Sequence, residues 1–193
     1  RATRCALADA AMARTVPLPG FGAAAVGFDT PFEMLEACHE RVQRTLGLQE
    51  RLCRYLLDTG CDASAMAAAR DVLRYFDIAA PLHHEDEEKH VFPLLQGSSD
   101  AALRDAVARL HGEHQAMAAR WQEARAALEA LAEGRITAFS DVQQAALAAF
   151  AAGYAEHIRI EETLVYPAAR AMLDADALQA MGAEMRRRRG ATQ

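Results

Sequence analysis

The stretch HHEDEEKHVFP at residues 83–93 is repeated without gaps as HIRIEETLVYP at residues 157–167. In both copies a histidine is followed four residues later by a pair of glutamates, and an aromatic residue and a proline close the segment. Residues four apart lie on one face of an α-helix, so His83 lies beside Glu87 and His157 beside Glu161. Two such helices facing each other would bring imidazoles and carboxylates to one point, as a two-metal site requires.

Capping, proline and glycine signals around this repeat predict an all-α protein, an up-down-up-down four-helix bundle with an irregular N-terminal arm and a short C-terminal helix. Thr30-Pro31-Phe32-Glu33 is typical of a capping box with proline in the first turn. Pro81 and Pro167 are expected to kink the helices that carry the repeat. The predicted helices cover residues 30–58, 62–97, 100–134, 141–173 and 175–189. The predicted divisions are the arm at 1–28, the bundle at 29–174, and the C-terminal helix and tail at 175–193.

Composition limits the functional class. A length of 193 residues suits one domain, and the net charge of −6 argues against nucleic-acid binding. The basic run Arg186–Arg189 is expected to be a solvated helix end. No apolar run approaches the roughly 20 residues of a membrane span. The four cysteines show no zinc-like spacing, and scattered thiols favour a cytoplasmic protein.

Most of the seven histidines lie on apolar faces of the predicted helices. His39 follows Leu35 at helical spacing, and His114 follows Leu110. Each of the four long helices therefore directs at least one histidine inward. A single inward histidine is usually a hydrogen-bonded core residue, but two buried glutamates need a cation or a shifted pKa. The combination predicts a metal site.

The remaining polar residues of the repeat are expected to have other positions. His84 is rotated by about 100° from His83 and should point outward or lie outside the ligand set. His90 is expected to line the pocket or to hydrogen-bond to a ligand, without coordinating. The other acidic residues, which are Glu85, Asp86, Glu88 and Glu162, are expected to form a solvated edge. Phe92 and Tyr166 are expected to serve only in packing.

The doubled motif, with His39 and His114 on the other two helices, resembles that of the hemerythrin-like (HHE cation-binding) family over roughly residues 30–173. The resemblance implies a four-helix bundle that holds two non-haem irons bridged by two carboxylates. Carried over to this chain, the bridges would be Glu87 and Glu161. The terminal ligands would be His39, His83, His111, His114 and His157. In oxygen-carrying members the third helix has a His-x3-His pair, whereas His111 and His114 are three apart.

Mixed imidazole and carboxylate ligands suit iron, and manganese or zinc can also occupy such sites. With the resemblance, this indicates a protein that binds or senses dioxygen, nitric oxide or peroxide, more in the manner of a binding protein than of an enzyme. Two alternatives remain: an iron storage or iron-sensing protein, and a di-iron redox enzyme such as a peroxidase or an iron–sulfur repair factor. Apolar residues of the arm, such as Phe21 and Phe28, could pack on the bundle or on a second chain of a homodimer.

Overall fold

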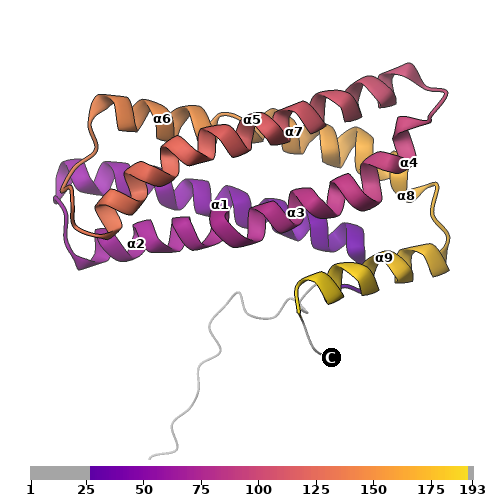
Figure 1. The fold of residues 1–193 in the computed structure, drawn as a ribbon, viewed down its shortest axis with the longest axis horizontal. Helices are drawn as coiled ribbons and strands as arrows, with labels where there is room; N and C mark the ends of the chain where they lie inside the picture. Colours follow the sequence, from indigo (N-terminus) through magenta and orange to yellow (C-terminus); the bar gives the residue numbers. More distant parts are fainter. Residues whose placement is uncertain (1–26, 191–193) are drawn as a thin grey trace, which may run out of the picture.

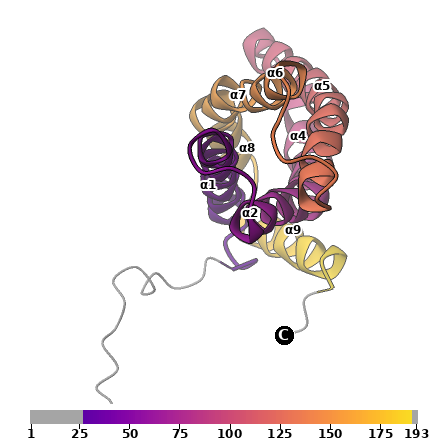
Figure 2. The ribbon, with the colours of Figure 1, turned by 90° about the vertical axis from the view of Figure 1, so that its left-hand side faces the viewer.

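The computed structural model of the protein describes residues 27–190, and regular secondary structure within that range is all helical. This confirms the all-α prediction. The helices other than α9 form long rods that lie side by side along the long axis (Figure 1) and surround a common axis, with α9 outside them (Figure 2). Rod 1 is α1 (Pro31–Asp58), rod 3 is α5 (Ala101–Ala132), and α9 is Ala175–Arg188. Rod 2 consists of α2 (Ala63–Arg74), η1 (Tyr75–Ala79), α3 (Ala80–Asp86), η2 (Glu87–Val91) and α4 (Phe92–Gln96). Rod 4 consists of α6 (Asp141–Ala151), α7 (Tyr154–Ile160), η3 (Glu161–Val165) and α8 (Tyr166–Arg170).

Side-chain caps define where several helices begin. Asp62, Asp100 and Asp174 each accept a hydrogen bond from a backbone N–H of the first helical turn. Ser140 does the same within a complete capping box. The capping box expected at Thr30 was a wrong prediction, because the Thr30 hydroxyl donates to the carbonyl of residue 27 and α1 has no side-chain cap. Proline in the first turn of α1 is present as expected.

Three π-helical segments, η1, η2 and η3, each end two residues before a proline. The prolines are Pro81, Pro93 and Pro167. A proline inside an α-helix lacks an N–H and its ring clashes with the carbonyl four residues earlier. The wider π turn accommodates that conflict without ending the rod. The kinks expected at Pro81 and Pro167 are therefore local changes of helical pitch, and two of the three π segments begin at Glu87 and Glu161.

The core is divided into two apolar clusters with a polar layer between them. Leu35, Leu110 and Ile160 belong to the cluster near α4 and α8, whereas Val42 and Met117 belong to the cluster near the connection between α1 and α2. Along α1 and α5, the histidines at 39 and 114 fall between members of the two clusters. Water is thus excluded from both ends of the layer that holds the polar side chains.

The remaining predictions concern the two ends of the chain, the continuity of its helices and membrane spans. The arm predicted at residues 1–28 lies outside the described residues, apart from Gly27 and Phe28. The C-terminal helix predicted over 175–189 is observed as α9. A break in rod 4 at Ala152–Gly153 was not predicted. None of the helices within residues 27–190 is long and apolar enough to cross a membrane.

Candidate metal centre

Six of the seven residues predicted as ligands lie together in the polar layer. They come from all four rods, and none is more than 4 % exposed. They are His39, His83, Glu87, His114, His157 and Glu161. The helical spacing of four places His83 next to Glu87, with 3.4 Å from Nε2 to Oε1, and His157 next to Glu161, with 2.9 Å from Nε2 to Oε1. The inward faces predicted from the sequence thus meet at one point.

The two carboxylates each extend between two groups of imidazoles. Glu161 has Oε1 2.9 Å from His157 Nε2 and Oε2 3.1 Å from His39 Nε2. Glu87 has Oε1 3.4 Å from His83 Nε2 and Oε2 3.4 Å from His114 Nε2. One oxygen of each carboxylate therefore faces His39 and His83, and the other faces His114 and His157. A carboxylate that bridges two cations needs this division of its oxygens.

Several buried polar atoms of the centre lack a partner. Among residues 27–190, His83 Nδ1, Glu87 Oε2 and both carboxylate oxygens of Glu161 have no well-aligned hydrogen bond. An unpartnered carboxylate oxygen in an apolar interior is costly. Cations would satisfy these oxygens, so the donor set fits a metal centre.

The pKa shifts of the central side chains agree with this reading. Burial, together with the neighbouring charge of Glu161, raises the pKa of Glu87 well above its ordinary value. Burial also opposes the charge on Glu161, but the imidazoles of His114, His157 and His39 outweigh it and hold its pKa well below the ordinary value. Burial and His39 lower the pKa of His83 well below its ordinary value. The His83 imidazole is therefore neutral at physiological pH, as a metal ligand must be.

Three further carboxylates orient the imidazoles from outside. Glu162 lies 2.9 Å from His39 Nδ1, Glu88 lies 2.8 Å from His114 Nδ1, and Glu113 lies 2.9 Å from His157 Nδ1. These contacts place the proton on Nδ1 and leave Nε2 free toward the centre. Glu88 and Glu162 are partly solvent-exposed, as predicted for an acidic edge, but their contacts with the histidines of the centre were not predicted. In each copy of the repeat the first glutamate faces the centre and the second contacts a histidine of another rod.

The structure adds two residues that sequence reasoning excluded. His84 stacks on His114 with ring centroids 3.9 Å apart, and these two with His157 form a group that could hold a cation. The second addition is Tyr166, whose hydroxyl donates to Glu87 and lies 3.2 Å from His39 Nε2. Tyr166 follows η3, and the wider π turn alters the direction that regular helical spacing predicts. The aromatic residue shared by both copies of the repeat was the available signal.

Two other histidines lie away from the centre. The His111 side chain is 49 % exposed, with Nδ1 3.7 Å from Glu88, so the structure does not bring it to the other predicted ligands. A spacing of three rotates it by about 60° from His114 around α5, toward the edge of the buried face. His90 turns toward α9, where its Nε2 lies 2.6 Å from Glu184. His90 therefore does not line the centre, contrary to the expectation from the sequence.

Asp86 and the C-terminal arginines also depart from expectation. Asp86 is fully buried and pairs with Arg188, the last residue of α9, and with Arg189 just after it, with 3.1 Å from Arg189 Nη1 to Asp86 Oδ1. The predictions of a solvated acidic edge at Asp86 and a solvated basic helix end were therefore wrong at these residues. The contact fixes α9 to the segment of rod 2 that carries Glu87.

The protein is all helical within residues 27–190, and its buried imidazoles surround two carboxylates whose oxygens face different pairs of histidines. This arrangement defines a candidate cation-binding helical domain. The chain belongs to the family of the hemerythrin HHE cation binding domain, whose model matches residues 30–169. It is also 34 % identical over 163 residues to an uncharacterized protein of Haemophilus influenzae, covering 84 % of this chain and 91 % of that protein. The resemblance stated from the doubled motif is thereby confirmed.

Proposed function

We propose that the chain holds two iron ions at the centre of an up-down-up-down four-helix bundle, and that this pair binds or senses dioxygen or a related small molecule. One observation carries the proposal: Glu87 and Glu161 each direct their two oxygens toward different pairs of imidazoles. Membership of a cation-binding family supports the metal. The identity of the metal rests on the donor set, because imidazole and carboxylate without thiolate suit iron.

The donors fall into two halves that share the carboxylates. His39 and His83 form the first half, and His114 and His157 form the second. Each half has one further side chain beside it, Tyr166 in the first and His84 in the second. The two halves would thus give their metal ions similar donors but different neighbouring side chains.

Two ferrous ions at this centre would supply two electrons to a small oxidant such as dioxygen. The residues of the chain prepare the site for that chemistry in three ways. Glu88, Glu113 and Glu162 hold the protons on the outer imidazole nitrogens and keep the inner nitrogens directed at the centre. The Tyr166 hydroxyl keeps a proton against Glu87. The two apolar clusters exclude water and large substrates.

An iron store or iron sensor is the second candidate. It is favoured by the unpartnered carboxylate oxygens at the middle of the core. A chain with such atoms depends on cation binding for part of its stability, so metal occupancy itself could be the signal.

Metal analysis with visible spectroscopy tests the proposal. We expect about two irons per chain, and an absorption band that appears when the reduced protein meets air. Iron uptake without a spectral response to air or nitric oxide would favour the store or sensor. Zinc or manganese in the protein, with iron refused, would overturn the assignment of iron. A folded chain that takes up no metal would overturn the proposal as a whole.

A further inference from the structure

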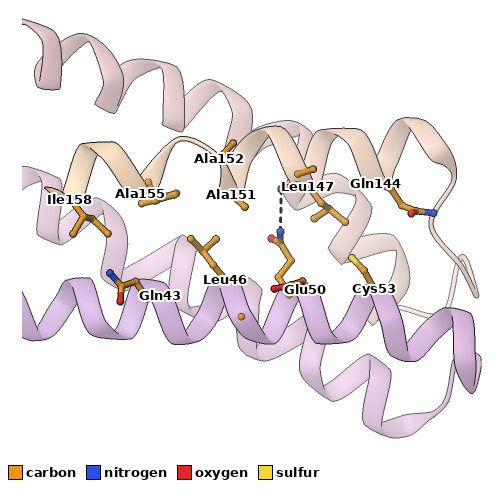
Figure 3. A pocket seen from close by; sticks show the side chains of 14 residues that line it. Gln43, Leu46, Glu50, Cys53, Gln144, Leu147, Ala151, Ala152, Ala155 and Ile158 are labelled. Atoms are coloured by element: carbon orange, nitrogen blue, oxygen red, sulfur yellow. Dashed lines mark hydrogen bonds between the residues drawn. The ribbon is translucent and has the colours of Figure 1, made fainter. Parts of the chain in front are cut away.

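The internal repeat relates not only the candidate ligands but also the residues that line two surface clefts beside them. Aligning His39 with His114 pairs α1 with α5, and aligning the two copies of the motif pairs rod 2 with rod 4. One cleft lies between α1 and rod 4 and has Ile158 at one end, as Figure 3 shows; we call it the Ile158 cleft. The other lies between rod 2 and α5 and is lined by His84; we call it the His84 cleft. Gln43 and Leu46 of the first correspond to Ala118 and Trp121 of the second.

The paired clefts differ in the residue nearest the centre. Ile158, in one cleft, and His84, in the other, occupy equivalent positions in the repeat. Ile158 is 4 % exposed and apolar, so the Ile158 cleft presents no polar group of the centre. His84 is only half-buried, whereas the six principal donors are all buried. Among the described side chains around the centre, His84 is thus the one that a molecule in a cleft can touch.

The size and walls of the His84 cleft select what could enter. Its volume is about 160 Å³, against about 780 Å³ for the Ile158 cleft. An engineered apolar cavity of about 150 Å³ holds benzene, so the His84 cleft suits molecules of a few atoms. Phe76, Phe150 and Trp121 line it, and apolar walls disfavour ions. Trp121 is fixed in place because its indole N–H donates to Asp77 at 2.9 Å.

We propose that small neutral molecules reach the second half of the centre through the His84 cleft, and that His84 is the side chain they contact there. This inference rests on the proposed function, since the iron pair is what would bind the molecule. It adds to that function a route by which small molecules enter and a limit on their size. It also makes the second half of the centre more accessible than the first. Tyr166, the extra side chain of the first half, is 2 % exposed and lines neither cleft, so the first half is closed by comparison.

A measurement without added iron tests the route alone. Trp121 is the single tryptophan of the chain, so quenching of tryptophan fluorescence by dissolved oxygen reports entry beside it. Ala118→Phe narrows the His84 cleft, and Ala155→Phe narrows the Ile158 cleft from a position that is also exposed. We expect the quenching constant to fall several-fold in Ala118→Phe and to stay unchanged in Ala155→Phe. Equal constants in both variants, or a fall only in Ala155→Phe, would overturn the route.

Nitric oxide binding to the iron(II)-loaded full chain tests the contact. In stopped-flow measurements Ala118→Phe should slow association about tenfold at unchanged iron content, while Ala155→Phe should match the parent. His84→Ile, which copies the residue at 158, should speed nitric oxide dissociation about tenfold by removing a polar contact. Parent-like dissociation in His84→Ile with full iron content would overturn the role of His84. Failure of the parent itself to bind iron would instead refute the proposed function, and the quenching result would still decide the route.

Discussion

Glu87 and Glu161 occupy equivalent positions in the repeat, yet their pKa values move in opposite directions. Glu161 lies near three imidazoles, whereas Glu87 is buried beside the charge of Glu161 and accepts a hydrogen bond from Tyr166. Two carboxylates so close cannot both ionise easily in an apolar interior. Cations between them would remove that conflict, which is why these two residues should dominate metal retention.

Replacing either central carboxylate should therefore release metal. We expect Glu87→Ala and Glu161→Ala to lower bound metal sharply, because each removes an oxygen donor from both halves. His84→Ala is the control from the same turn of rod 2, and it should change metal content little because two imidazoles and the carboxylates remain in its half. Metal analysis after dialysis gives the comparison. Equal metal content in all three variants would refute the assignment of the bridges.

The outer carboxylates should affect affinity less. Glu162→Gln weakens the hold on His39 Nδ1, which the carboxylate contacts at 2.9 Å. Loss of such an outer contact typically costs 10- to 100-fold in metal affinity. Glu156→Gln is the matched control, because among residues 27–190 Glu156 pairs only with the exposed Arg159. A competition assay with a coloured chelator measures both, and an effect of Glu156→Gln as large as that of Glu162→Gln would contradict the orienting role.

At the scale of single residues, helical periodicity predicted the inward histidines and glutamates but not their neighbours. His39, for example, lies on the apolar stripe that the sequence showed. Asp86 was missed because its arginine partners, at the C-terminal end of α9, are more than 100 residues away, a contact that no local pattern contains. Tyr166 was missed because ideal 3.6-residue spacing was applied across the π-helical segment η3. His84 was missed because its stacking partner, His114, comes from another rod, which spacing along one helix does not show.

The helical elements show how the prolines and α9 position the centre. A proline in the sequence predicted a kink, and the structure contains a wider turn in its place, beginning at Glu87 in rod 2 and at Glu161 in rod 4. The position of α9 was outside the reach of periodicity. It packs against the start of the described chain so closely that a Cβ on Gly182 would lie 1.8 Å from the Phe28 carbonyl oxygen.

Two glycine-to-alanine substitutions in helices should therefore have opposite effects. Gly182→Ala must displace backbone, and overpacking of this kind costs about 1–3 kcal/mol. Gly112→Ala in α5 meets nothing within 4 Å, so helix propensity should stabilise it by roughly 0.5–1 kcal/mol. Urea unfolding of both variants measures the free energy of unfolding. If Gly182→Ala were as stable as Gly112→Ala, the close packing of α9 on Phe28 would be wrong.

At the scale of the whole molecule, the polar layer interrupts the apolar core midway along the rods. The sequence predicted four helices with inward histidines, and from that a central layer follows. It could not predict that the halves of the layer differ, because the contacts of Tyr166 with Glu87 and of His84 with His114 join different rods. Since the layer separates two apolar clusters, its own stability should limit how cooperatively those clusters unfold together.

Metal should accordingly raise the stability of the entire chain rather than of one rod. A ligand present at 100 times its Kd stabilises the folded state by about 2.7 kcal/mol, which for a chain of this size raises Tm by roughly 5–10 °C. Anaerobic iron(II) should produce that shift in a single calorimetric transition. The double variant Glu87→Ala/Glu161→Ala should show no shift, because it has lost every oxygen shared by the two halves. Iron that raised Tm equally in the double variant would be bound elsewhere, and an unchanged Tm in the iron-loaded parent would mean that the layer does not couple the two clusters.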